Sequence, residues 1–318
     1  MERQLAEGQA PQPIVNATIE AVIQAYKDYL VGEGRSKKTK AKYWSVLSRV
    51  KDLADTSGKS IILHIDLAFV DKYRAKRAKT CQPKTVYNES VILRQLVKFA
   101  FTRRMVSIDP LVGLKLKKPK PTPQPYFDDA QIDQILAAAR APHADTFLLL
   151  AETGLRIGEA KWLAWNDVDL VANVIHVRAK PGWRPKTGDE RAIPISPKLQ
   201  KLFERRPRRG RWVLTALPTT TRPATDRQID EGTALKSLQR VLTRLKLTGK
   251  LHSFRHSFVS RCCTRGIEES VIRSWVGHID RSIMQLYTPI SSQISQDRIR
   301  RLSESDRSDD SDGTGPKS

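Results

Sequence analysis

Four residues near the carboxyl end of the chain have types and spacing that suit phosphate chemistry. They lie within residues 251–287, LHSFRHSFVSRCCTRGIEESVIRSWVGHIDRSIMQLY. His252 and Arg255 are three residues apart in a segment with a helical pattern, so both side chains can face one ligand. His278 follows a glycine and stands nine residues before Tyr287. We expect the two imidazoles, the guanidinium and the phenol to converge.

Such a set of side chains suits the cleavage of a phosphodiester bond. A tyrosine oxygen can attack phosphorus when its proton is removed and when cationic donors stabilise the charge of the pentavalent transition state. Arginine suits that charge because its planar fork bonds two phosphate oxygens at once. Spacing alone leaves a second interpretation open, since most His, Arg and Tyr residues at helical spacing are ordinary surface or core groups.

The same segment also predicts which side of its helix faces the core. Phe254, Phe258 and Cys262 follow one another at four-residue spacing, which places them on one face. His256 adjoins Arg255 and points about a quarter turn away from it, so we expect a core role for this histidine.

Three stretches of the sequence resemble the tyrosine recombinases, the phage-integrase family. HSFRHSF, WVGH and then Tyr287 resemble the family's box II, in which His-x-x-Arg precedes Gly-His and a nucleophilic tyrosine. TGLRIGEA resembles box I, which assigns a phosphate-binding arginine to Arg156 and a supporting acid to Glu159. KTG followed by RAIP resembles the family's hairpin, whose lysine would be Lys186. The resemblance extends over about residues 16–295.

The resemblance implies a catalytic set of Arg156, Lys186, His252, Arg255, His278 and Tyr287, with Glu159 in support. Tyr287 would attack the scissile phosphate, form a 3′-phosphotyrosyl link and release a 5′-hydroxyl. Arg156 and Arg255 would hold the non-bridging oxygens. Lys186 would protonate the departing 5′ oxygen. The resemblance implies no metal, cofactor or ATP.

The histidines have separate implied roles in proton handling. His252 would manage the tyrosine proton, and His278 would donate a hydrogen bond to the phosphate. Lys180 and Arg184 lie close enough in sequence to Lys186 to be rival proton donors.

The overall charge predicts a polyanionic partner. The 318 residues include 56 Lys and Arg against 34 Asp and Glu, a formal net charge of +22. Nucleic acid is the leading candidate. The resemblance to tyrosine recombinases implies that this partner is double-stranded DNA with a specific recombination site. No stretch has the length and apolarity of a membrane span, and the amino terminus lacks the apolar core of a signal peptide. The prediction is a cytoplasmic, nucleoid-associated protein without membrane contact.

The three cysteines do not indicate a metal or disulfide site. Cys81, Cys262 and Cys263 lack metal-ligand spacing, and their odd number argues against a disulfide framework. We interpret the adjacent pair as small core residues.

The first third of the chain predicts a bundle of short helices. Apolar residues at helical spacing indicate helices over about residues 18–34, 36–50, 67–79 and 84–103. The stretch resembles the all-helical, SAM-like core-binding domain of tyrosine recombinases. A solvated charged face is the simpler alternative, but the high net charge favours contact with the DNA backbone. The expected contacts are Lys37, Lys38, Lys40 and Lys42.

A linker follows this bundle. Residues 115–125, KLKKPKPTPQP, carry proline at every second position from Pro119, which predicts an extended, stiff segment. Lys117, Lys118 and Lys120 are further expected DNA contacts. The predicted organisation is a disordered start (1–15), a helical DNA-binding domain (16–114), a linker (115–127), a catalytic domain (128–302) and a disordered tail (303–318).

The second domain is expected to be mostly helical, with a small antiparallel sheet. Asp128 suits the N-cap of one helix, and a second helix ends at Gly154. A third is expected over residues 155–165 and a fourth over 234–247. Strands are expected over residues 173–180, 191–195 and 212–214. The fold class is therefore mainly α, and the resemblance implies the DNA breaking-rejoining fold for this domain.

Some assignments stay open at this stage. The basic segment RRPRRGR, residues 205–211, either touches phosphate or is simply solvated. A type IB topoisomerase uses a similar set of catalytic residues, and a DNA-binding protein without catalysis is a third class. The helical domain before the linker and the Gly-His nine residues before the tyrosine favour a recombinase, which is either a mobile-element integrase or a Xer-type resolvase.

The resemblance also implies assembly. We expect a homotetramer on two duplexes, with accessory DNA-bending proteins as further partners. Apolar residues after the tyrosine would dock into a neighbouring protomer: Ile290, Ile294, Ile299 and Leu302.

Overall fold

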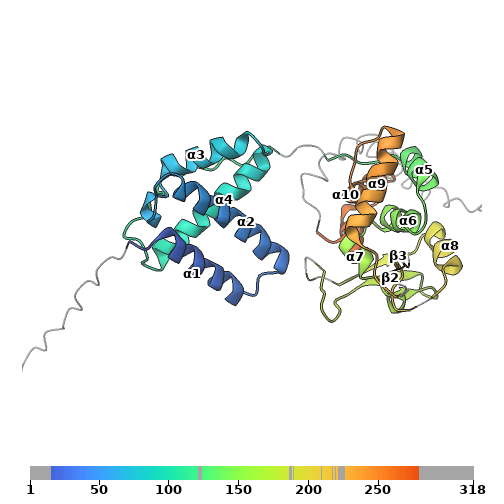
Figure 1. Ribbon diagram of the computed structural model, residues 1–318. Helices are drawn as coiled ribbons and strands as arrows, with labels where there is room; N and C mark the ends of the chain where they lie inside the picture. The colour runs from blue at the N-terminus through green and yellow to red at the C-terminus, as the bar shows by residue number, and fades with distance from the viewer. Residues whose placement is uncertain are drawn as a thin grey trace, which may run out of the picture. The chain divides into compact units, whose positions relative to one another are not determined.

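The computed structural model describes residues 16–120, 124–185, 188, 190–208, 210–216, 218, 220 and 226–278. Several expectations fall outside these residues: the disordered ends, Lys186, Tyr287 and the docking segment with Ile290, Ile294, Ile299 and Leu302. The chain divides between Pro121 and Thr122 into two compact units (Figure 1).

The described residues of the first unit form four α-helices and one 3-10 turn, and Figure 1 shows how the helices are arranged. They are α1 (Ile19–Gly32), α2 (Lys37–Asp55), η1 (Ile62–His64), α3 (Leu67–Ala78) and α4 (Pro83–Thr102). Thr18, Ser36 and Asp66 cap α1, α2 and α3, because each side chain accepts a hydrogen bond from a backbone N–H of the first turn. The caps explain where these helices begin.

The core of the first unit is apolar, with one polar centre. Leu47, Leu93 and Leu96 are fully buried where α2 and α4 pack together. Glu89 is also buried on α4, and its carboxylate accepts hydrogen bonds from Arg77 Nε at 2.7 Å and Tyr73 Oη at 3.0 Å. A buried charge is tolerated when it is paired and hydrogen-bonded in this way.

The second unit contains seven α-helices and a three-stranded sheet within the residues described. The helices are α5 (Asp129–Ala138), α6 (His143–Thr153), α7 (Ile157–Lys161), α8 (Pro197–Arg205), α9 (Glu231–Leu245), α10 (Leu251–Thr264) and α11 (Glu269–Val276). A 3-10 turn, η2 (Trp165–Asp167), precedes β1 (Val168–Asp169), β2 (Val174–Val177) and β3 (Arg191–Pro194). The order is β1-β2-β3, both pairings are antiparallel, and Ile175 lies opposite Ile193.

Helix α6 lies at the centre of the second unit (Figure 1). It contacts α5, α7, α8, α9 and α10. Phe147 and Leu150 of α6 are fully buried, and Phe147 stacks on Phe254 of α10 with ring centroids 5.5 Å apart. Helix α11 packs against β3. The chain thereby brings α7, β3, α10 and α11 to the neighbourhood of the α6 C-terminus.

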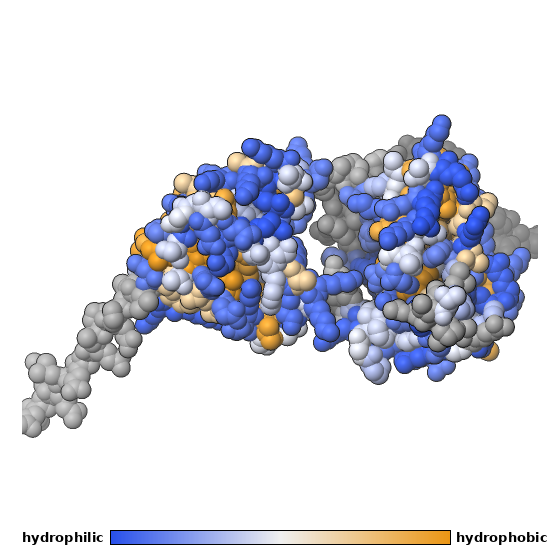
Figure 2. Space-filling view, in the orientation of Figure 1, coloured by the Kyte–Doolittle hydropathy of each residue, from blue (hydrophilic) through white to orange (hydrophobic). Residues whose placement is uncertain are grey.

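The structure confirms the predicted fold class, since helices predominate in both units and the sheet is small and antiparallel. Asp128 caps α5 with a full capping box, and α6 ends at Gly154 in the left-handed conformation, as predicted. No helix among the residues described is long and apolar enough to cross a membrane. Hydrophilic side chains cover much of the visible face of each unit (Figure 2).

Two local predictions are wrong. The helix expected over residues 155–165 is only α7, which ends at Lys161, because the chain turns so that Ala164 can bridge Trp212. The strand expected over residues 212–214 is absent from the described part of the chain, where only single bridges form, from Ala164 to Trp212 and from Thr215 to Gln228. Helix α8 and strand β1 were not predicted.

Candidate active site

Arg255 is the most deeply buried charged group of the site. It lies on α10 with 4% of its surface exposed. Within the part of the chain that the structure describes, its guanidinium donates hydrogen bonds only to main-chain carbonyls: to Gly154 at 3.0 Å, Val276 at 2.6 Å and His278 at 3.2 Å. Arg255 forms no ion pair with a carboxylate among the residues described. No carboxylate in the described ranges is thus bonded directly to this guanidinium.

The conformation of Gly154 brings its own carbonyl oxygen within hydrogen-bond distance of the Arg255 guanidinium. The residue ends α6 with φ +64°, a conformation that L side chains rarely adopt. An added Cβ would lie 2.7 Å from Phe258 Cδ1 and 2.9 Å from Val276 Cγ1. The turn thus needs glycine for both its backbone and its packing against α10 and α11.

Glu159 is the buried carboxylate that organises the other arginines. Arg156 donates to it twice at 2.9 Å, once from its backbone N–H and once from its guanidinium. Arg191 of β3 donates to Glu159 Oε2 at 2.6 Å and to the carbonyl of Trp275 at 2.7 Å. Glu159 is 5% exposed, so its ion pairs with these two arginines are shielded from solvent.

The carbonyl of His278 joins these two groups of contacts. Its oxygen accepts hydrogen bonds from Arg156 Nη2 at 3.3 Å and from Arg255 Nη2 at 3.2 Å. Arg156 lies at the start of α7, Arg255 on α10 and His278 just after α11, so three distant segments meet at one oxygen. The His278 residue itself is exposed.

Among the described residues near the His278 carbonyl oxygen, positively charged side chains outnumber negatively charged ones. Burial alone would raise the pKa of Glu159, but the ion pairs and hydrogen bonds from Arg191 and Arg156 outweigh it and hold the pKa below its ordinary value. Burial, with the nearby charge of Arg156, lowers the pKa of Arg255 to about 9, so this guanidinium remains cationic at neutral pH. Arg156 and Arg191 thus pair with one carboxylate while Arg255 adds a third positive charge nearby, so that cations exceed anions among the described residues of the site.

The two histidines of α10 behave differently. His252 is exposed, and its ring meets that of His256 edge-on with centroids 4.8 Å apart. His256 is 5% exposed, and burial together with the charge of Arg255 lowers its pKa. The predicted core positions of Phe254, Phe258 and Cys262 are confirmed, because all three are buried.

The structure brings together Arg156, Glu159, Arg255 and His278 of the predicted site, while Lys186 and Tyr287 lie outside the described residues. Sequence reasoning missed Arg191.

Of the two rival proton donors, Lys180 is paired with the buried Asp167 at 2.8 Å and its side chain is 9% exposed. Asp167 therefore already occupies the ammonium group of Lys180.

The lysines expected to touch DNA lie on the surface of the first unit. Lys37, Lys38 and Lys42 are exposed near the start of α2, whereas Lys40 is half-buried. In the segment after α4, the three expected contacts are all exposed: Lys117, Lys118 and Lys120.

Cys81, Cys262 and Cys263 are free thiols, of which only Cys262 is buried. No group of three potential metal ligands occurs among the described residues.

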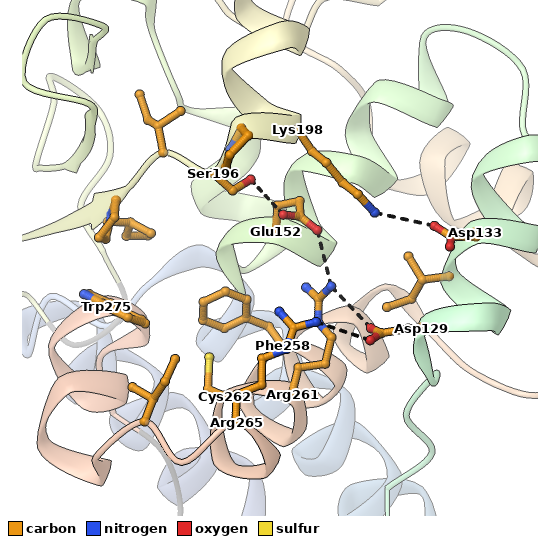
Figure 3. Close-up of a pocket in the computed structure, with 16 residues that line it drawn as sticks. Asp129, Asp133, Glu152, Ser196, Lys198, Phe258, Arg261, Cys262, Arg265 and Trp275 are labelled. Atoms are coloured by element: carbon orange, nitrogen blue, oxygen red, sulfur yellow. Dashed lines mark hydrogen bonds and ion pairs between the residues drawn. The ribbon is translucent and has the colours of Figure 1, made fainter.

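One cavity of the second unit lies beside the arginine cluster and not on it. Its volume is about 580 Å³, and its lining includes Ile193 of β3 and Trp275 of α11. Trp275 lies at one end of the cavity and the ion pair of Lys198 with Asp133 at the other (Figure 3). Of the candidate catalytic residues that the structure describes, Arg156, His252, Arg255 and His278, none lines it.

Comparisons with known proteins agree in the kind of protein they find. A family model described as the phage integrase family matches residues 125–293. The tyrosine recombinase XerC of Pediococcus pentosaceus is 24% identical over 303 residues, which cover 88% of this chain and 97% of that protein. The tyrosine recombinase XerA of Pyrococcus furiosus is 24% identical over 281 residues, which cover 88% and 93%.

Solved structures show the same fold. The Tn1549 transposon integrase in complex with transposon right end DNA superposes with a TM-score of 0.70 at 18% identity, covering 89% of this chain and 99% of that chain. A lambda integrase tetramer bound to a Holliday junction gives a TM-score of 0.67 at 16% identity, covering 86% and 83%.

Proposed function

The chain belongs to the phage integrase family, and on that premise we propose how its residues take part in cutting and rejoining DNA. Its activity is that of a tyrosine-type site-specific recombinase, which joins DNA through a 3′-phosphotyrosyl intermediate. The alternative of a type IB topoisomerase is not favoured, because the family model and the named relatives are integrases and recombinases.

The arginine cluster is the observation that carries the assignment of the site. Arg156 and Arg255 both point at the carbonyl oxygen of His278, so their donors already converge on one oxygen atom. Glu159 fixes Arg156 and Arg191, but one carboxylate cannot balance three cations. A phosphate placed here would receive donors that are held in position before it binds, which is the condition for stabilising a transition state electrostatically.

We assign the remaining steps to residues outside the arginine cluster. Tyr287 attacks the scissile phosphorus, the bond to the 5′ oxygen breaks, and the strand remains attached through its 3′ phosphate. His252 takes the tyrosine proton, and Lys186 gives a proton to the departing 5′ oxygen. His278 donates a hydrogen bond to the phosphate. The covalent link conserves the phosphoester, so that attack by another strand's 5′-hydroxyl reverses these steps without ATP.

The nucleophile is tested by Tyr287→Phe. The variant should retain its affinity for DNA and lose the covalent adduct, because the phenyl ring preserves packing but carries no nucleophilic oxygen. A nicked suicide substrate traps the adduct, which a denaturing gel separates from free protein. An undiminished adduct in the variant would show that another residue attacks.

The partners that we propose are duplex DNA with a specific recombination site and three further copies of the chain. The relatives support this, since one solved structure is a lambda integrase tetramer bound to a Holliday junction. Accessory DNA-bending proteins and action on the nucleoid in the cytoplasm belong to the same proposal. Genomic neighbourhood would separate a mobile-element integrase, which has an adjacent attachment site, from a Xer-type resolvase.

A further inference from the structure

The basic segment 205–211 divides into two parts with different environments. Arg205 and Arg206 both pair with Asp145 of α6, and the Arg205 contact measures 2.6 Å. These two arginines fasten the end of α8 to α6. Arg208 and Arg211, which follow them in the segment, pair with no carboxylate among the residues described.

Arg208 and Arg211 instead lie on tryptophan rings. The guanidinium carbon of Arg208 is 5.2 Å from the ring centroid of Trp165, and that of Arg211 is 4.6 Å from the centroid of Trp212. Both arginines are exposed, and neither forms an ion pair with a carboxylate within the residues described. Stacking on an aromatic face orients a planar guanidinium and leaves the N–H groups at its edge available to an anion.

A polar pocket of about 370 Å³ adjoins Arg211. Arg178 and Lys180 line it, and both pair with the single buried carboxylate of Asp167, at 2.9 Å and 2.8 Å. Trp165 also lines the pocket, is 8% exposed, and its indole N–H has no acceptor among the described residues. The pocket therefore presents more donors and more positive charge than its own acceptors satisfy.

The backbone that carries Arg211 is fixed. Gly210 has φ +78°, and the carboxylate of Asp226 packs against its Cα, where a Cβ would clash. The same carboxylate accepts a hydrogen bond from the backbone N–H of Arg211 at 2.9 Å. Trp212 in turn meets Trp162 edge-on, with centroids 5.4 Å apart. Arg211 is therefore held over its tryptophan by the fold.

We propose that this arginine–tryptophan surface binds backbone phosphates of duplex DNA away from the cleaved position. We define it as Arg178, Lys180, Arg208 and Arg211 with Trp165 and Trp212. Its free polar groups are donors, and a phosphate offers only acceptors, whereas base edges offer both. The ligand class rests on the proposed function, but the surface includes none of the proposed catalytic residues.

The test measures how the affinity for duplex DNA depends on salt. Each phosphate neutralised contributes roughly 0.9 to the slope of log K against log salt concentration. The double variant Arg208→Gln/Arg211→Gln should lower the magnitude of that slope by about 2. Arg205→Gln is the matched control, because it removes an arginine of the same segment whose guanidinium is paired with Asp145. Arg208→Lys/Arg211→Lys, which keeps both charges, should retain most of the slope.

An unchanged slope in the Gln double variant, or an equal loss in Arg205→Gln, would overturn the proposal. Melting temperatures of the variants equal to that of the parent protein establish that the loss does not come from unfolding. Adduct formation by the parent protein on a suicide substrate tests the proposed function separately, because the slopes are measurable whether or not the adduct forms.

Discussion

Glu159 is a buried carboxylate that fixes two guanidinium groups, and its charge determines how the site responds to acid. Glu159→Gln should lower the free energy of unfolding by about 3–5 kcal/mol at neutral pH, because it leaves buried guanidinium groups without their anion. The folded-state pKa lies below the ordinary 4.5, so the stabilisation is complete above that value and is lost as pH falls through the folded pKa. Urea unfolding of both proteins between neutral and acidic pH should show the difference between them shrink.

Glu204→Gln is the control for this measurement, since Glu204 is an exposed glutamate of the same unit. It should change the free energy of unfolding by less than about 0.5 kcal/mol at any pH. A difference between the parent protein and Glu159→Gln that stays constant down to strongly acidic pH would contradict the assigned ion pairs.

Lys186 permits a test of the leaving-group step. Lys186→Ala should slow cleavage of ordinary DNA by roughly 10²–10⁴-fold, because an alkoxide departs poorly without a proton. Replacing the bridging 5′ oxygen by sulfur should restore the rate, since a thiolate leaves unaided. Single-turnover cleavage of both substrates by Lys186→Ala, Lys180→Ala and Arg184→Ala identifies the donor. Sulfur rescue of Lys180→Ala alone would show that the donor is the lysine now seen beside Asp167.

Residues of the site that belong to short motifs were predictable from the sequence. Arg156 with Glu159 are neighbours along one segment, so spacing brings them together. Arg191 was not predicted as part of the site, because its partners Glu159 and the Trp275 carbonyl are 32 and 84 residues away. Its one local signal is its position as the first residue of strand β3. The burial of Glu159 likewise depends on packing that no local pattern specifies.

Gly154 shows how one helix end couples to the site. Gly154→Ala would force a left-handed backbone on alanine, at about 1–2 kcal/mol, and would drive a methyl group into Phe258 and Val276. Overpacking adds typically 1–3 kcal/mol. The expected loss of unfolding free energy is therefore about 2–5 kcal/mol. Tryptophan fluorescence is the measurement of choice, since five of the six tryptophans lie in the second unit.

Gly182→Ala separates strain from packing. Gly182 also has a positive φ, +81°, but an added Cβ would meet Trp162 only at an ordinary 3.9 Å. This variant should lose only the backbone contribution of about 1–2 kcal/mol. An equal loss in both variants would mean that the contact of Gly154 with α10 and α11 contributes nothing.

At the scale of elements, the sequence predicted long amphipathic helices best. Helices α1 to α4 follow from apolar spacing and from side-chain caps such as Ser36. Elements defined by tertiary pairing were harder: β1 has only two residues, and the segment around Trp212 forms single bridges in place of a strand. Helix α7 was predicted too long because the apolar pattern continues past Lys161, where the chain turns to satisfy Ala164 and Trp212.

The whole molecule combines a high positive charge with cations that are already committed internally. Arg77, Arg191 and Arg206 pair with buried or half-buried carboxylates, so they hold the fold together and do not add to the surface available to DNA. Exposed lysines near the start of α2 and after α4 remain available in the first unit. The count of 56 Lys and Arg residues therefore overstates the number of side chains available for phosphate contacts.

Assembly on DNA is the prediction that belongs to the whole molecule. Truncation after Pro289 removes the apolar positions Ile290, Ile294, Ile299 and Leu302. We expect the truncated protein to bind a single site with unchanged affinity and to lose cooperativity on paired sites, because the segment would no longer reach a neighbouring protomer. Mobility-shift titrations with one-site and two-site duplexes measure both quantities. Equal cooperativity in the truncated protein would refute the exchange.

The cavity beside Trp275 allows a sharper form of this experiment. Its lining is largely apolar and includes Ile267. Ile267→Asp should lose cooperativity like the truncation if the segment docks there, because the carboxylate would be buried without a partner. In a mixture, the truncated protein supplies an intact cavity and Ile267→Asp supplies an intact segment, so mixed pairs should regain cooperative binding. Failure of the mixture, with each protein binding single sites normally, would place the docking surface elsewhere.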